Sequence, residues 1–237
     1  GVNSIIRNPS LFDLSRDRAL YTFRTSDVLM PYDPRFNNTL PYGSATANRS
    51  GFKLGVEYGT DEDIVNAGTD TYLLNELRGQ GSDQLKNFLL SRVSVDFNIH
   101  KLITWEKKIK FTGGYQFERT SRDGADLERI NLTSNLTEFG LEIEAFKSFE
   151  ILGGAKFLNS RGNEYVPQIN EFNIINDFPT RNLIDSEETL YAGGIKYNFK
   201  KDIYLTIQYQ SFTSRLGMDN PNDYGLEQIF ALYSMRF

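Results

Sequence analysis

Alternation of apolar and polar side chains along this 237-residue chain constrains its fold more than any other feature. Successive side chains of a β-strand point to opposite faces, so alternation predicts strands with one apolar and one polar row. In residues 51–60 the apolar row is Phe52, Leu54, Val56 and Tyr58. The pattern predicts eight strands, at 51–60, 88–100, 105–119, 136–146, 149–158, 189–200, 203–214 and 226–237.

The connections between these strands alternate in length. Those at 100–103, 147–148 and 200–202 are short, whereas those near 61–87, 120–135, 159–188 and 215–225 are long and polar. Transmembrane β-barrels sort their connections in this way, with short turns on the periplasmic side and long loops outside. We therefore expect an all-β, antiparallel up-and-down transmembrane β-barrel of about eight strands over residues 51–237. An even number of strands places both ends of this unit on the periplasmic side.

Composition excludes several other classes of protein. The net charge of −5 and the lack of a polybasic block argue against a nucleic-acid partner. Without cysteine, the chain has no disulfide scaffold, thiolate metal site or cysteine nucleophile. No run of about 18 apolar residues is present, so a transmembrane helix is not expected. The first residues lack the basic start and apolar core of a signal peptide, so we expect a mature or trimmed chain, with a cytosolic protein that has no signal as the alternative.

Aromatic residues make up 14% of the chain and gather near the ends of the expected apolar rows. Because the middles of these rows favour aliphatic residues and glycine, we interpret the rings as two interfacial girdles rather than as ordinary strand formers. The set near the short turns is Phe52, Phe97, Trp105, Phe149, Tyr197, Phe199 and Phe237. The set near the long loops is Tyr58, Tyr115, Phe117, Phe139, Phe157, Tyr191 and Tyr209.

The C-terminus carries a recognisable pattern, with Ile229, Ala231, Tyr233, Met235 and Phe237 at alternate positions. It resembles the C-terminal strand signal of Gram-negative outer-membrane β-barrel proteins, in which a terminal aromatic follows alternating hydrophobic residues. In that family the barrel-assembly machinery reads this signal during biogenesis. By size the barrel is similar to small outer-membrane barrels of the OmpA and OmpX type. The resemblance implies a location in the bacterial outer membrane, in contact with its lipid.

Residues 1–50 depart from this family pattern. Alternation at 19–23 allows a short strand, whereas 31–43 is rich in proline and other turn formers and does not suit a central strand. We expect an N-terminal extension that lies in the periplasm or plugs the lumen, or that contacts another protein. The alternative is that residues 51–237 are the C-terminal part of a larger barrel, which has further strands upstream.

Charged residues of both signs occupy the inward rows of the expected strands. Eight strands enclose an interior that side chains fill, so these charges are expected to pair in a structural network rather than line a conducting pore. The network comprises Lys53, Glu57, Arg92, Asp96, Lys110, Glu118, Glu142, Glu144, Lys156, Lys196 and Arg236, and the same rows carry Lys108 and Glu150.

No arrangement of residues predicts catalysis, a cofactor or a metal. His100 is the only histidine, and a solvated turn residue is a better interpretation of it than a Ser–His catalyst. The acidic stretches 61–63 and 123–128 offer oxygen ligands for calcium, but neither has EF-hand spacing, and we expect solvated loops. The apolar residues of the loop 159–188 favour packing on other loops or, as the alternative, on a partner protein.

These features favour a non-enzymatic integral barrel that serves as a structural or accessory subunit of an outer-membrane complex. Its expected partners are other outer-membrane or periplasmic proteins. A porin-like channel or transporter for small solutes is the alternative, above all if the barrel is larger. An outer-membrane enzyme is the third hypothesis.

Overall fold

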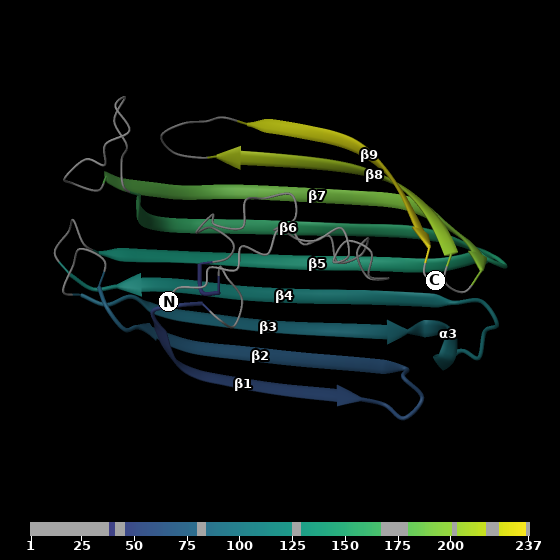
Figure 1. Cartoon of the computed structure of the whole chain (residues 1–237), viewed down its shortest axis with the longest axis horizontal. Coiled ribbons are helices and arrows are strands. Elements are labelled where there is room, and N and C mark those ends of the chain that lie inside the picture. Colours follow the sequence, from purple (N-terminus) through teal and green to yellow (C-terminus); the bar gives the residue numbers. More distant parts are fainter. Residues whose placement is uncertain are drawn as a thin grey trace.

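The computed structural model describes residues 38–40, 46–79, 84–124, 129–166, 180–200, 203–216 and 223–235. These residues form one antiparallel sheet whose nine strands lie side by side in the order of the sequence (Figure 1). The strands are β1 (Arg49–Gly59), β2 (Val65–Glu76), β3 (Asn87–Asn98), β4 (Ile109–Arg122), β5 (Ile130–Phe146), β6 (Phe149–Val166), β7 (Thr180–Lys200), β8 (Ile203–Leu216) and β9 (Tyr224–Met235). A short helix, α3 (Ile99–Leu102), joins β3 to β4. None of the helices within these ranges has the length and apolar character needed to cross a membrane.

The all-β, antiparallel up-and-down architecture is confirmed, but the number of strands differs from the expected eight. The additional strand is β2, which lies in the stretch that we expected to be a long loop. Its outward row begins with Val65 and Ala67 and continues with Thr69 and Thr71, so its apolar period is weak. Pairing along the full length of β1 and β3 holds this segment in the sheet despite the weak signal.

Several strands are longer than the apolar alternation predicts. β5 begins at Ile130 rather than near residue 136, β6 continues to Val166, and β7 begins at Thr180. The outward row of these extensions is polar, as at Asn131 and Asn159, so it has no apolar period to detect. In contrast, β4 begins at Ile109 rather than near 105, because Trp105 belongs to the connection that follows α3.

The two ends of the sheet differ in their connections. At the turn end lie 60–64, 99–108, 147–148 and 201–202, whereas at the loop end lie 77–86, 123–129, 167–179 and 217–223. With nine strands, β1 begins at the loop end and β9 finishes at the turn end, so the expectation that both termini of the unit share one side was wrong. Because β1 runs in the direction opposite to the one expected, Phe52 lies toward the loop end and Tyr58 toward the turn end, the reverse of their predicted places in the two aromatic sets.

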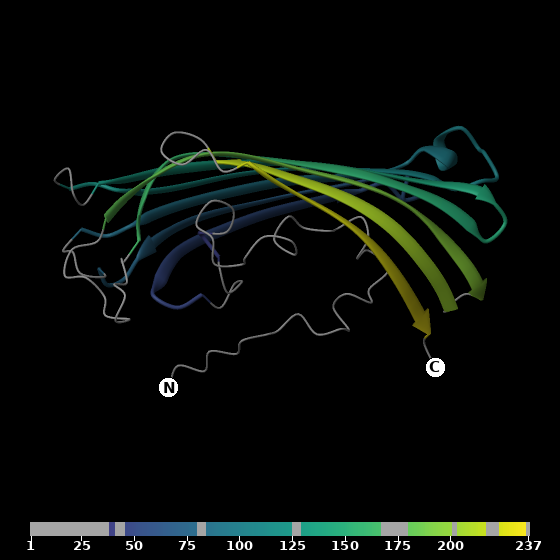
Figure 2. The same ribbon diagram turned by 90° about the horizontal axis from the view of Figure 1, so that it is seen from above.

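The sheet is bent into a trough that opens on one side (Figure 2). No pairing joins β1 to β9 among the described residues, so closure into a barrel is not observed. On the convex face, one row of paired residues crosses six neighbouring strands with aliphatic side chains only. That row is Ile109, Ile143, Ile151, Ile195, Ile207 and Ala231.

The concave face is packed toward the loop end. Leu158, Leu190 and Phe212 form a buried cluster there, and Leu136 packs against it. Phe88, Leu90, Ile130 and Leu132 are also buried on the concave rows near the loop end. These side chains form most of the apolar core of the described sheet, and Leu152 and Tyr204 are buried on the same face toward the turn end.

Candidate functional site

The turn-end half of the concave face encloses a hollow of about 850 Å³. Residues of β1 to β5 and β7 line it, and most of the functional groups on its wall are charged or polar. The charged ones are Glu57, Asp96, Lys108, Lys110, Glu138, Glu142 and Lys196. A hollow with such a lining holds water more readily than an apolar ligand.

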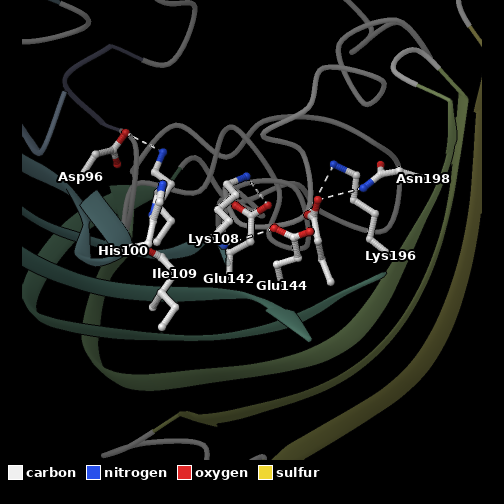
Figure 3. Close-up of polar contacts among 10 residues, drawn as sticks. Asp96, His100, Lys108, Ile109, Glu142, Glu144, Lys196 and Asn198 are labelled. Atoms are coloured by element: carbon white, nitrogen blue, oxygen red, sulfur yellow. Dashed lines mark hydrogen bonds and ion pairs between the residues drawn. The ribbon is translucent and has the colours of Figure 1, made fainter. Parts of the chain in front are cut away.

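Ion pairs link neighbouring strands around this hollow (Figure 3). Lys110 Nζ of β4 lies 2.9 Å from Asp96 Oδ2 of β3, and Lys108 Nζ lies 2.6 Å from Glu142 Oε1 of β5. The sheet register is consistent with these pairs. Lys110 is paired with Asn98 of β3, and Asp96 lies two residues away on the same row; Glu142 of β5 is paired with Lys110, and Lys108 lies two residues away. Each lysine can therefore reach a carboxylate on an adjacent strand without backbone distortion.

The neighbouring strands β6 and β7 repeat this arrangement. Lys196 Nζ lies 3.8 Å from Glu150 Oε2, and Asn198 Nδ2 donates a hydrogen bond of 2.8 Å to Glu150 Oε1. Glu144, a further acidic residue of this region, accepts a hydrogen bond of 3.2 Å from the backbone N–H of Lys108. Glu144 thus fixes the end of the β3–β4 connection rather than facing open space.

The loop-end half of the concave face binds residues 38–40 of the chain itself. The backbone N–H of Thr39 donates to the buried carboxylate of Glu118. Asn38 Nδ2 donates to Thr120 Oγ1 at 2.8 Å and to Glu164 Oε2 at 3.2 Å. Glu164 also pairs with Lys86 at 3.1 Å. Thr39 and Leu40 are buried, so this tripeptide fills the trough at the loop end.

The other residues of the expected charge network lie on the same face at separate positions. Lys53 pairs with Asp70 of β2 at 2.8 Å, and Lys156 pairs with Glu138 at 3.2 Å. Arg92 Nε donates to Gln116 Oε1 at 2.7 Å. Arg236 lies outside the described residues. The sequence did not reveal Asp70 as a member, because β2 was not expected to be a strand.

The C-terminal signal residues follow the convex face as far as the structure describes them. Ile229, Ala231 and Tyr233 are exposed there, and Met235 ends β9. Phe237 lies outside the described residues, as do residues 167–179 of the stretch 159–188 that we expected to be an apolar loop. The rest of that stretch is not a loop, because 159–166 belong to β6 and 180–188 to β7. Tyr233 contacts Phe199, which contacts Tyr197, with ring centroids 6.4 Å and 4.8 Å apart. These three rings form an aromatic group at the turn end.

Residues considered for catalysis or metal binding have structural partners. His100 Nδ1 lies 3.0 Å from the carbonyl oxygen of Ile109, where its N–H can hold α3 against β4 (Figure 3). Lys101 Nζ contacts the carbonyl oxygen of Glu62 and the carboxylate of Asp63 in the β1–β2 connection. Within the described ranges, no three His, Cys, Asp or Glu side chains are grouped as metal ligands. Part of the acidic stretch 123–128 lies outside these ranges.

Comparisons with known proteins add no relative: no family model, curated protein or solved structure matches this chain.

Proposed function

We propose that this chain forms the wall of a β-barrel in the bacterial outer membrane, and that the barrel passes small polar solutes through a water-filled lumen. The observation that carries the proposal is the opposite character of the two faces of one sheet. The convex face presents an aliphatic row across six strands. The concave face carries the ion pairs and the hollow.

Lipid is the solvent that best suits the convex face. Val93, Leu141 and Ile195 are 50%, 40% and 42% exposed, although each belongs to a strand paired on both sides. A contiguous apolar surface of this size is unfavourable in water and favourable against hydrocarbon. Backbone polar groups of a sheet are tolerated in a membrane when every strand is paired, as in a closed barrel.

A water-filled lumen is supported by the size of the sheet and the state of the concave face. Eight strands close around an interior that side chains just fill, and the interior widens with each further strand until barrels of about 16–18 strands leave an aqueous channel. This sheet has nine strands, is not closed among the described residues, and retains a hollow of about 850 Å³ at the turn end. The charged side chains of the lining, and the water that they bind, offer hydrogen bonds to a polar solute along the wall.

A structural or accessory subunit of an outer-membrane complex is the second candidate. It is favoured by the pairing of the lysines in the hollow with carboxylates and by the docking of residues 38–40 in the trough. In that case a filled lumen would replace the channel, and other outer-membrane or periplasmic proteins would be the partners. In both cases insertion by the barrel-assembly machinery is proposed from the C-terminal strand pattern.

A matched pair of lysine substitutions on β3 tests the orientation of the faces. Val93 points to the convex side, whereas its neighbour Ser94 lines the hollow opposite two glycines, Gly68 and Gly114. Val93→Lys should reduce heat-modifiable, membrane-inserted protein, because a lysine at mid-bilayer costs about 2–4 kcal/mol. Ser94→Lys should insert normally. Equal insertion of both variants, or a well-folded chain that needs no detergent, would contradict the membrane proposal.

Liposome swelling and single-channel recording separate the two candidates. Purified protein in lipid vesicles should admit a small sugar, and Ser94→Lys should lower the single-channel conductance because the new side chain enters the hollow. Vesicles that stay sealed with fully inserted protein would reject the channel and favour the accessory subunit. Pull-down from mild detergent would then identify stoichiometric partners.

A further inference from the structure

Both outer strands of the sheet present an unpaired edge within the described residues. The edge at β1 is long and unprotected, since its sequence RSGFKLGVEYG contains no proline and its pairing with β2 is continuous. Its outward residues Phe52 and Leu54 are 80% and 70% exposed, whereas Val93 and Leu141, in the middle of interior strands, are 50% and 40% exposed. A flat, apolar edge of this kind is a template for another strand.

The direction of the strands restricts what can pair with this edge. β1 and β9 both run from the loop end to the turn end, because they are the first and ninth strands of one meander. Direct pairing of β1 with β9 would therefore be parallel. A second copy inserted in the same orientation offers the same two edges and also pairs in parallel. An antiparallel neighbour must run from the turn end to the loop end.

Chain that directly precedes β1 meets this requirement. Residues 38–40 lie on the concave face at the loop end, where they contact Glu118, Thr120 and Glu164. Asn48 is tied to the β2–β3 loop, since its Nδ2 donates to the carbonyl oxygen of Arg78 at 2.8 Å. The chain therefore enters β1 from the loop end. A strand that ends before residue 38 at this end would run antiparallel to β1.

We propose that residues before 38 supply the strand beside β1, with the alternating stretch 19–23 at its centre. Its structure lies outside the described residues, but its sequence places Ala19, Tyr21 and Phe23 on one row and Leu20 and Thr22 on the other. The tripeptide 38–40 is then the return of this strand through the trough to β1. One such strand makes the number of strands even, as in bacterial single-chain barrels.

The proposal deepens the proposed barrel and rests on it for the argument against a second copy. The absence of cysteine from the chain permits a direct test, because any disulfide must join introduced residues. Tyr21→Cys is combined in turn with Phe52→Cys, Leu54→Cys and Val56→Cys, which sample different registers on the outward row. Cysteines across neighbouring strands bond only when their Cα atoms lie about 4.4–6.8 Å apart.

The matched control combines Tyr21→Cys with Leu141→Cys. Leu141 is also an exposed outward leucine, but β5 is already paired with β4 and β6. We expect an intramolecular disulfide with at least one β1 position and none with Leu141→Cys, read by peptide mass spectrometry. Equal crosslinking to Leu141→Cys, no crosslink to any β1 position, or crosslinks only between copies would overturn the proposal.

Hydrogen exchange in the unsubstituted chain provides a second readout that no cysteine can disturb. With a strand beside it, every backbone N–H in the middle of β1 is protected, as in β5. Without one, every second N–H of β1 exchanges rapidly, and that result would reject the proposal. Neither readout depends on lipid. The strand beside β1 can therefore be found even if Val93→Lys and Ser94→Lys reject the membrane location, and the membrane location can be supported even if the strand is not found.

Discussion

The two halves of the concave face are built on the same strands but differ in what fills them. Toward the loop end, Phe212, Leu190 and Leu158 form a buried cluster, and Thr39 and Leu40 of the chain cover the face nearby. Toward the turn end, lysines and carboxylates pair across strands around a hollow of about 850 Å³. Stabilising contacts and accessible space are therefore separated along the length of β3, β4 and β5, which contribute to both halves.

This separation has a physical cause in side-chain chemistry. Burial of an apolar group is favourable wherever other side chains exclude water, so the loop-end half is a core. Partly buried ion pairs contribute little net free energy, because the loss of hydration offsets their attraction. Removal of one member of a partly exposed pair, such as Lys110 and Asp96, should therefore change stability little, whereas removal of an apolar side chain from the loop-end cluster should change it strongly.

The largest effect should follow from emptying the loop-end cluster. Phe212→Ala removes a ring that is only 2% exposed, and we expect a loss of about 3–5 kcal/mol in the free energy of unfolding. Tyr209→Ala on the convex face of the same strand is the control, because Tyr209 is 44% exposed. Urea titration followed by gel mobility in detergent measures both. Similar losses for the two variants would show that the cluster is not the core.

The next effect should come from the tripeptide that covers the loop end. Glu118→Ala removes the carboxylate that accepts the N–H of Thr39, and a hydrogen bond to a charged group is worth about 1.5–3 kcal/mol. We expect faster proteolysis near residue 38 with the barrel intact. Glu57→Ala, on the exposed wall of the hollow, should leave the cleavage rate unchanged. Unchanged cleavage in Glu118→Ala would mean that this contact does not hold the segment.

The sequence predicted the fold wherever one face was strongly apolar. Alternation predicted the ends of β1, β3 and β8 to within a few residues, because in each of these strands the outward row is clearly more apolar than the inward row. It missed β2, whose outward threonines resemble a polar loop. The predicted strands at 149–158 and 189–200 were also shorter than β6 and β7 at the loop end, where the outward row is mostly polar and gives no apolar period.

Prediction of the site was limited in a different way. The inward rows carry the expected charges, but which partners meet depends on register, and a sequence without hairpin signals does not give register. Lys110 reaches Asp96 rather than Glu142, although Glu142 is its directly paired residue. The omission of β2 also reversed the expected direction of β1. Because the prediction missed one strand, it placed the start of β1 at the turn end, whereas the N-terminal segment enters β1 from the loop end.

Two adjacent glycines in the turn-end half test whether its backbone is as constrained as the loop-end core. A Cβ at Gly194, on the concave row, would lie 2.6 Å from the carbonyl oxygen of Ile207, whereas at Gly193 the nearest atom is 4.0 Å away. Gly194→Ala should cost about 1–3 kcal/mol through displacement of β8. Gly193→Ala should be neutral or slightly stabilising in the same urea titration. A reversed order would contradict the close approach of β7 and β8.

The smallest effect on stability, but the most informative about the hollow, should follow from removing one lysine. Lys110→Met breaks the 2.9 Å pair with half-buried Asp96, and we expect a loss of about 1 kcal/mol. The control Lys53→Met breaks a similar pair with Asp70, but both side chains are exposed at the edge, so its melting should not change measurably. Because Asp96 lines the hollow, its uncompensated charge should shift the reversal potential in a KCl gradient toward cation preference in Lys110→Met. If the two variants shift it equally, ions do not pass beside Asp96, and the turn-end half is not the conducting path.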